Sequence, residues 1–198
     1  MMARRRQSNK TRTGRLRIVA GNWRSRLLDI ADVDGLRPTS ERIRETLFNW
    51  LSPQIRGARC LDLYAGTGAL GLEALSRGAA SVVFVERSAA AARALERNIA
   101  VLDATEATVL NKDARSYLAG APTGRFDLVF LDPPFAADLL EETCRLLAKQ
   151  DLLADGALVY LEQEKSKSEP QLPDGWQIEK NKTAGMVRYM LVKARKDN

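Results

Sequence analysis

Residues 128–138 read LVFLDPPFAAD, in which a run of apolar residues ends at Asp132, followed by Pro133, Pro134 and Phe135. Proline cannot donate a hydrogen bond to a sheet, so the strand must end at Asp132. A carboxylate there can accept hydrogen bonds or a proton, and an aromatic ring beside it can stack on a planar group. The ordinary alternative is a strand end, a turn and a core phenylalanine.

A glycine-rich stretch follows an earlier apolar run. Gly66, Gly68 and Gly71 form a GxGxxG within DLYAGTGALGLEAL, and Glu86 lies 20 positions after the first of them. This spacing matches the dinucleotide fingerprint, in which glycines let the backbone approach a ligand and the acid binds ribose hydroxyls. The stretch therefore predicts a nucleotide-type cofactor, and a nicotinamide enzyme is one interpretation. Glycines that serve only a tight turn are the other alternative.

Two further acids help to choose the cofactor. Asp62 ends the first of these strands, where a pyrophosphate would bring two anions close together. A carboxylate at this position suits a ligand with cationic groups, such as the ammonium and sulfonium of S-adenosylmethionine. Asp113, in the sequence NKDARSY, follows a later strand and could bond an adenine amine or cap the next helix. Acids at three successive strand ends favour S-adenosylmethionine.

The composition excludes several kinds of chemistry. The 198 residues include no histidine, which removes imidazole bases, Ser-His-Asp triads and histidine-bound metals. Cys60 and Cys144 form no CxxC pair, so we expect no metal site and a reduced, cytoplasmic environment. No apolar run reaches the roughly 20 residues that span a bilayer, and the basic start is not followed by an apolar signal segment. A globular cytoplasmic protein is expected.

Strands and helices alternate from residue 59 onward. The strand-like segments are CLDLY, SVVFVE, ATVLN, FDLVFLD and GALVYLE, and helical patterns lie between them at about residues 69–77, 88–101, 114–119 and 137–149. Alternation with continuously apolar strands predicts a mostly parallel sheet covered on both faces. The last segment, residues 176–194, reads as two strands around a short loop, and at least one of them should be antiparallel. The expected fold class is α/β.

The N-terminal part of the chain is strongly basic. The first 60 residues carry 14 Lys and Arg against 5 Asp and Glu, whereas the remaining residues carry 17 against 20. We divide the chain into a basic arm at 1–14, a β-hairpin at 15–36 with a turn at Gly21, and a main domain at 37–198 that opens with an amphipathic helix at 41–51. A basic extension on a nearly neutral body suggests a nucleic-acid partner. A solvated tail is the alternative.

The cofactor segment resembles that of the class I S-adenosylmethionine-dependent methyltransferases, whose seven-stranded sheet ends in an antiparallel hairpin. The resemblance implies a Rossmann-like fold with S-adenosylmethionine as cofactor. Asp62 and the loop at 66–68 would hold the methionine part. Glu86 would hold the ribose, and Asp113 with Ala114 the adenine. The cofactor-binding candidates are Asp62, Tyr64, Ala65, Gly66, Thr67, Gly68, Glu86, Arg87, Asp113 and Ala114.

The DPPF sequence resembles the (D/N)PP(F/Y) motif of methyltransferases that act on exocyclic amines of bases. By this resemblance, Asp132 and the Pro133 carbonyl accept hydrogen bonds from the target amine and aim its lone pair at the methyl group. A carboxylate of ordinary pKa is a weak base near neutrality, so positioning is the larger expected contribution. Pro134 stiffens the turn, and Phe135 stacks on a base taken out of its helix. These four residues are the catalytic candidates.

A much longer part of the chain, about residues 15–192, resembles the RsmD family. The resemblance is carried by RIVAGNWRSRLL, GLRPTSERIRETLFNWL, DLYAGTGALGLEALSRGA, DPPF and KTAGMVRY. It implies methylation of the N2 amine of one guanine, guanine 966, in 16S ribosomal RNA. The partner would be this RNA within the 30S subunit or its assembly intermediate, and we expect a monomer. Ser25 departs from the family, which usually has glycine between two basic residues there.

Basic and aromatic side chains on the hairpin are candidates for RNA binding. Trp23 lies among arginines, and such an interleaved surface suits phosphates and an unstacked base. Packing of Trp23 against the helix at 41–51 is the alternative. The turn before that helix is assigned to the cofactor or base pocket by the family resemblance alone. The RNA-binding candidates are Arg17, Trp23, Arg24, Arg26, Arg37 and Thr39.

Three other functions remain open. The DPPF motif suits any exocyclic amine, so an adenine-N6 methyltransferase of DNA or RNA is the first. A nicotinamide oxidoreductase built on the GxGxxG is the second, although Asp62 and the lack of a proton relay argue against it. A non-catalytic RNA-binding or assembly protein is the third, and it predicts that Asp132→Ala leaves cellular function intact.

Overall fold

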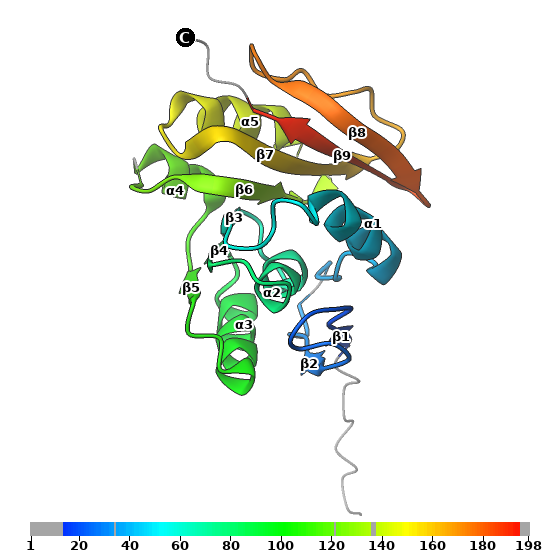
Figure 1. Ribbon diagram of the computed structural model, residues 1–198, viewed down its shortest axis with the longest axis vertical. Helices are drawn as coiled ribbons and strands as arrows, with labels where there is room; N and C mark the ends of the chain where they lie inside the picture. Colours follow the sequence, from blue (N-terminus) through cyan, green and yellow to red (C-terminus); the bar gives the residue numbers. More distant parts are fainter. Residues whose placement is uncertain (1–13, 34, 121, 136–137, 195–198) are drawn as a thin grey trace, which may run out of the picture.

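The computed structural model describes residues 14–33, 35–120, 122–135 and 138–194 (Figure 1). The helices are α1 (Glu41–Leu51), α2 (Ala69–Ser76), α3 (Ala89–Leu102), α4 (Ala114–Ala119) and α5 (Leu140–Lys149). The strands are β1 (Arg15–Arg17), β2 (Leu27–Asp29), β3 (Arg59–Asp62), β4 (Ser81–Val85), β5 (Ala107–Leu110), β6 (Phe126–Leu131), β7 (Leu153–Glu164), β8 (Gln177–Ala184) and β9 (Val187–Lys193). Except for Gly14, the basic arm predicted at 1–14 lies outside the described residues.

Seven strands form one sheet in the order β5-β4-β3-β6-β7-β9-β8. The five strands from β3 to β7 run parallel to one another, whereas β9 is antiparallel to both β7 and β8. The predicted α/β class and the antiparallel C-terminal hairpin are therefore confirmed. The two N-terminal strands form a separate antiparallel pair.

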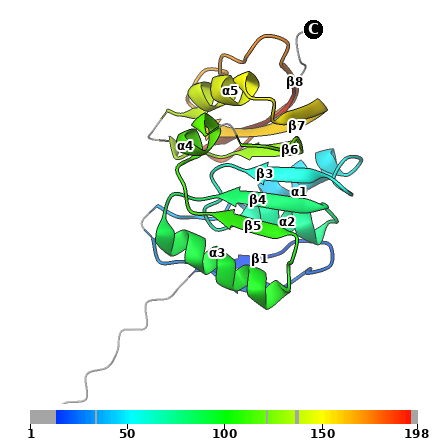
Figure 2. The same cartoon turned by 90° about the vertical axis from the view of Figure 1, so that its left-hand side faces the viewer.

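Helices cover both faces of the large sheet (Figure 2). α1, α2 and α3 pack on one face together with the N-terminal strands, in a core that includes Leu47, Leu72 and Phe130. α4 and α5 cover the other face, in a core that includes Val129 and Leu147. Because successive strand residues enter opposite cores, the strands are apolar throughout, which is the pattern that predicted a parallel sheet. In the part of the chain that the structure describes, no helix is both long and apolar enough to cross a bilayer.

Most element boundaries follow from local signals. Ser40 caps α1 by accepting a hydrogen bond from the N–H of Ile43, and the helix spans the predicted residues 41–51. β7 is longer than the predicted strand at 156–162. Gly156 has a φ of 73° and lies where the pairing with β6 shifts register, so the sequence pattern indicates a strand start where the structure has an irregularity within a strand.

The predicted hairpin forms, but its strands are short and its loop packs against the main domain. β1 and β2 contain three residues each, joined by the loop at residues 18–26. The N–H of Asn22 donates to the carbonyl of Ser76, at the end of α2, at 2.7 Å. A Cβ on Gly21 would lie 1.8 Å from the same carbonyl oxygen. Gly21 therefore permits close approach of the loop to α2, in addition to its role in the turn.

Ser25 adopts a φ of 67°, a left-handed conformation that L residues rarely take. Its N–H donates to the carbonyl of Ile18 at 2.8 Å, which closes the loop. Glycine reaches this conformation without a Cβ clash, so we expect Ser25→Gly to raise the free energy of unfolding by about 0.5–1 kcal/mol, measured by urea denaturation. Ser116→Gly, in the interior of α4, should lower it instead. A loss of stability in Ser25→Gly would contradict this account of the loop.

Candidate active site

Carboxylates gather at one edge of the sheet, where the parallel strands end. Asp62 ends β3, Glu86 follows β4 and Asp132 follows β6. β3 lies between β4 and β6, so these three strand ends are neighbours. Ligands of open α/β sheets bind at this edge, outside the carboxyl ends of the strands. The structure thus brings together acids that are 70 positions apart in the sequence.

The loop between β3 and α2 is left-handed at two glycines, Gly66 with a φ of 54° and Gly68 with a φ of 78°. Glu86 Oε2 accepts a hydrogen bond from the N–H of Gly66 at 2.8 Å, which ties the acid after β4 to this loop. Gly71 lies within α2, and a Cβ there would be 2.1 Å from the ring of Phe84 on β4. The first two glycines therefore shape the turn, and the third allows α2 to pack closely on the sheet.

Asp62 lies beneath this loop, and only 2% of its surface is exposed. Its Oδ2 accepts a hydrogen bond from the N–H of Gly71 at 3.2 Å, so it braces the start of α2. Burial raises the pKa of Asp62 to about 7, although the hydrogen bond from Gly71 opposes this shift. A cation nearby would favour the ionised carboxylate and an anion would disfavour it. This position therefore suits a cationic ligand better than a pyrophosphate.

The other cofactor candidates lie along the same edge. Asp113 is the N-cap of α4, and its Oδ1 accepts hydrogen bonds from the N–H groups of Arg115 and Ser116 at 3.0 and 3.2 Å. The capping role that the sequence allowed is therefore present. The hydroxyl of Tyr64 is 2.6 Å from that of Thr143 on α5. Of the remaining candidates, Arg87 is exposed, whereas the buried ones are Ala65, Thr67 and Ala114.

The chemistry of this edge fits S-adenosylmethionine. The two oxygens of Glu86 accept hydrogen bonds from the N–H groups of Gly66 and Ser88, at 2.8 and 2.6 Å. A carboxylate oxygen has two acceptor positions, so each oxygen can also accept a ribose hydroxyl. The neighbouring Asp62 and Glu86 supply negative charge for a ligand that carries an ammonium and a sulfonium group.

Asp132 lies at the tip of β6, and the hydroxyl of Thr39 donates to its Oδ2 at 3.3 Å. Thr39 comes two residues before α1, so the segment that precedes α1 passes the end of β6. Burial raises the pKa of Asp132 to about 6, and the hydrogen bond from Thr39 opposes the shift. Pro133 is buried, whereas Pro134 is exposed and Phe135 is partly exposed, so the end of the motif is accessible to a substrate.

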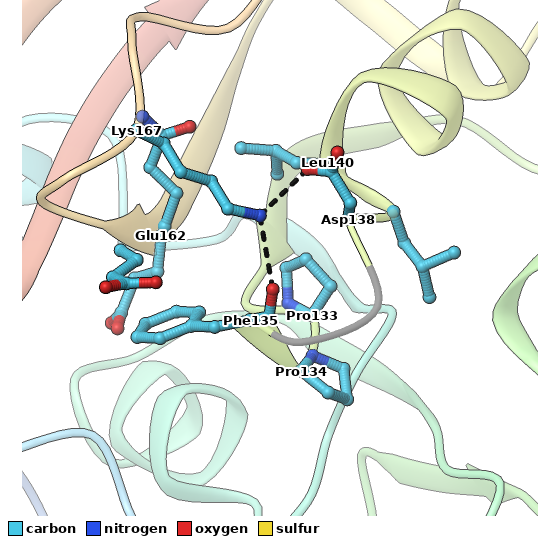
Figure 3. Close-up of a pocket in the computed structure, with 10 residues that line it drawn as sticks. Pro133, Pro134, Phe135, Asp138, Leu140, Glu162 and Lys167 are labelled. Carbon is cyan, nitrogen blue, oxygen red and sulfur yellow. Dashed lines mark hydrogen bonds and ion pairs between the residues drawn. The ribbon is translucent and has the colours of Figure 1, made fainter.

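Lys167, in the loop between β7 and β8, holds the DPPF turn through hydrogen bonds from its side chain (Figure 3). Its Nζ donates to the carbonyl of Phe135 at 3.2 Å and to Asp138 Oδ1 at 2.8 Å. No pattern in the sequence indicates a role for Lys167, because its contacts depend on the path of the loop between β7 and β8.

Glu162 on β7 is the acidic residue that our sequence analysis missed. Only 3% of its surface is exposed, and the hydroxyl of Tyr160 donates to its Oε1 at 2.5 Å. Burial, together with the charge of Asp132, raises the pKa of Glu162 well above its ordinary value. A signal was present: Glu162 closes the segment GALVYLE, just as other acids close their strands. No motif follows Glu162 in the sequence, and only the pairing of β7 with β6 places it beside Asp132.

The RNA-binding candidates lie in two regions: on β1 and the segment before α1, and in the loop between β1 and β2. Arg17 Nε donates to Glu41 Oε1 at 3.0 Å, which joins β1 to the first turn of α1, close to Thr39. Trp23 is partly buried and packs against the first core cluster, and its backbone N–H donates to Ser76 Oγ at 3.0 Å. The exposed candidates are Arg24 and Arg26 in the docked loop, and Arg37 before α1.

Comparison with known proteins adds independent information. A family model described as Conserved hypothetical protein 95 matches residues 16–193. Ribosomal RNA small subunit methyltransferase D of Escherichia coli K12 is 48% identical over 183 residues, which is 92% of each chain. The Haemophilus influenzae protein of the same name is 44% identical over 182 residues, covering 90% of this chain and 93% of that one. The solved structure of yhhF from Escherichia coli has a TM-score of 0.86 at 45% identity and covers 93% of this chain and 100% of that chain.

A sheet of this strand order, with a glycine loop after β3 and an acid at each neighbouring strand end, defines a Rossmann-like methyltransferase of class I. Within that class, the chain belongs to the RsmD family, the ribosomal RNA small subunit methyltransferase D proteins. The family resemblance seen in the sequence is confirmed.

Proposed function

We propose that this protein transfers a methyl group from S-adenosylmethionine to the exocyclic N2 of one guanine in 16S ribosomal RNA, acting on the 30S subunit or its assembly intermediate. The observation that carries the proposal is the place of Asp132. It follows β6, which pairs directly with β3, the strand that leads into the glycine loop. An amine held by Asp132 is therefore next to a ligand held by that loop. The name of the Escherichia coli relative supports ribosomal RNA as the substrate.

Four parts of the site would hold the methyl donor. When bound, S-adenosylmethionine supplies an electrophilic methyl group on its sulfonium sulfur. The backbone at 66–68 approaches the methionine part, and buried Asp62 favours its cationic groups. Glu86 accepts hydrogen bonds from the ribose hydroxyls. Asp113 accepts a hydrogen bond from the adenine amine, with Ala114 beside it.

Asp132 and its neighbours act on the acceptor. The lone pair of the guanine N2 is conjugated with the base ring, which makes it a poor nucleophile. Hydrogen bonds from the amine to Asp132 and to the Pro133 carbonyl favour a tetrahedral nitrogen whose lone pair points toward the methyl group. The proton that N2 loses goes to the Asp132 carboxylate or to water. Phe135 stacks on the base and offsets part of the cost of removing it from its helix.

The pH dependence of methyl transfer should report the carboxyl at the end of β6. Asp132 accepts the amine only when ionised, and its pKa is raised to about 6. We therefore expect kcat/KM to rise about tenfold per pH unit up to about pH 6 and to level off above it, since each pH unit below the pKa reduces the ionised fraction tenfold. Asp132→Asn should retain weak activity without this acidic limb. If kcat/KM of Asp132→Asn fell below pH 6 as it does for wild type, the ionising group would be another residue.

The salt dependence of RNA binding should report the hairpin arginines. Each phosphate contact contributes about 0.7–0.9 to the slope of log K against log salt concentration. We expect the double variant Arg24→Ala/Arg26→Ala to weaken binding and to reduce this slope by about 1.5. The control is Arg145→Ala/Lys149→Ala on α5, which covers the other face of the sheet (Figure 2). Equal slopes for wild type and the hairpin variant would remove these arginines from the RNA interface.

The activity itself is tested by mixing the protein with S-adenosylmethionine labelled in the methyl group and with unmodified 16S RNA, either free or in 30S particles. We expect transfer to the particle or its assembly intermediate above that to free RNA. Binding of S-adenosylmethionine without transfer to any RNA form would contradict the assigned substrate, and binding of a nicotinamide cofactor in its place would contradict the reaction.

A further inference from the structure

Glu162 lies beside Asp132 at the ligand-binding edge of the sheet. β6 and β7 are parallel, and their register extends to the pair Leu131 and Leu161. The next residues on the two strands are Asp132 and Glu162, and they point to the same face, since side chains alternate along a strand. Neighbouring strands are separated by about 4.8 Å, so the two side chains start as direct neighbours.

Two hydroxyl groups hold this carboxyl pair in place. Thr39 interacts with both carboxyls, and its hydroxyl donates to Asp132 Oδ2 at 3.3 Å. The hydroxyl of Tyr160 donates to Glu162 Oε1 at 2.5 Å. An almost fully buried acid is costly to keep in a protein core unless its polar atoms are used. The reaction described above gives Glu162 no task.

The side chain of Glu162 lies beside the DPPF turn (Figure 3). Glu162 lines the same pocket as Pro133, Pro134 and Phe135 (Figure 3). A base that stacks on Phe135 with its amine at Asp132 would therefore present the next position of its edge to Glu162.

We propose that Glu162 reads the target base by hydrogen-bonding to N1–H and O6 of the guanine whose N2 is held by Asp132. This inference rests on the proposed function. Bases taken out of a helix are read through hydrogen bonds to their Watson–Crick edge. Guanine presents there an acceptor and two donors in a row, O6, N1–H and N2–H. The adjacent carboxyls can satisfy all three, whereas adenine offers only an amine and one acceptor on this edge.

The protonation state of Glu162 agrees with this pairing. Burial and the neighbouring Asp132 raise the pKa of Glu162, which favours the protonated form of its carboxyl. A neutral carboxyl has one oxygen that accepts, here from N1–H, and one hydroxyl that donates, here to O6. Asp132, whose Oδ2 accepts a hydrogen bond from Thr39, is the acceptor for the amine. The two adjacent acids would therefore take different roles, with Asp132 accepting from the amine and Glu162 both accepting and donating.

The test compares two substrates, RNA with guanine or with 2-aminopurine at the target position, for four proteins. Ribosomal RNA with 2-aminopurine at the target position keeps the 2-amine that is methylated but lacks N1–H and O6. The proteins are wild type, Glu162→Ala and Glu162→Gln, with Glu179→Ala on the exposed strand β8 as a matched control. For each pair we would measure kcat/KM, together with S-adenosylmethionine affinity and thermal unfolding to verify the fold.

Wild type should prefer guanine over 2-aminopurine by about 100-fold, because a site built to hydrogen-bond an edge rejects an analogue that lacks it. Glu162→Ala should reduce this preference below about tenfold. Glu162→Gln should keep most of it, since an amide retains one acceptor and one donor, and this variant also serves if the alanine variant is unstable. The proposal is overturned if wild type treats both substrates alike, or if Glu162→Ala slows both equally. Failure of wild type on the guanine substrate would instead reject the proposed function itself.

Discussion

Asp132→Ala is expected to lower kcat for methyl transfer by about 10³-fold while leaving S-adenosylmethionine binding within about twofold. In the proposed mechanism, the variant removes the acceptor that orients the amine, and this orientation is required only when the methyl group is transferred. The variant also removes the hydrogen bond from the Thr39 hydroxyl to Asp132 Oδ2, which is 3.3 Å long in the wild type. Single-turnover transfer to 30S particles measures the step, and calorimetric titration measures the binding.

A control for this variant lies on the same strand. Asp127, at the other end of β6, accepts hydrogen bonds from Arg59 and has no part in the site. Asp127→Ala should keep kcat within about twofold of wild type, since surface substitutions away from the site act mainly on stability. Asp132→Asn retains a hydrogen-bond acceptor, so its kcat should lie between those of Asp132→Ala and Asp127→Ala. Full activity of Asp132→Ala would leave only a structural role for the DPPF turn.

The largest expected loss of stability comes from Glu73 in α2. Glu73 is fully buried and Arg44 is 1% exposed; their charged groups lie 3.0 Å apart. The two oxygens of Glu73 also accept hydrogen bonds from the N–H groups of Val19 and Ala20, both at 2.9 Å. Removing one partner of a buried ion pair costs about 3–5 kcal/mol, because the other charge remains buried without compensation. We therefore expect Glu73→Ala to lower the free energy of unfolding by that amount, measured by urea denaturation.

Two comparisons make this result specific. Glu45→Ala, on the exposed side of α1, should change stability by less than about 0.5 kcal/mol. Glu73→Gln keeps a hydrogen-bond acceptor and the shape of the side chain but loses the charge. Its loss of stability should lie between those of Glu45→Ala and Glu73→Ala. A loss below about 1 kcal/mol in Glu73→Ala would show that the hairpin and α1 dock without this network.

The same network also connects the hairpin with the site. Arg44 donates to the carbonyl of Arg17 in β1 at 2.8 Å and to the carbonyl of Thr39 at 3.2 Å. Thr39 in turn contacts Asp132. Variants of Glu73 that still fold should therefore show weakened methyl transfer as well as lower stability.

Local patterns were sufficient to predict the sheet and three of its acidic strand ends. Buried parallel strands must be apolar throughout, and glycine and proline mark where they stop, so the segments before Gly66 and Pro133 could be identified from the sequence. Ser40 and the apolar spacing of the following helix gave the bounds of α1. These features depend on residues close together in the chain.

Contacts between distant segments could not be predicted in this way. Glu73 reads as one polar residue in an apolar helix. Its ion pair with Arg77 is local, at 2.8 Å, but its buried partner Arg44 lies 29 positions earlier in a different helix. Glu162 lies beside Asp132 only because β7 pairs with β6. The left-handed Ser25 has a residue type that gives no sign of its backbone conformation. Each of these depends on tertiary packing, which no single local pattern contains.

The most direct test of the central claim is the identity of the methylated nucleoside. Labelled methyl would be transferred by wild type and by Asp132→Ala to unmodified 30S particles, and the RNA digested to nucleosides. The account predicts label in N2-methylguanosine with wild type and almost none with the variant. Label in N6-methyladenosine, or N2-methylguanosine formed equally by both proteins, would contradict it.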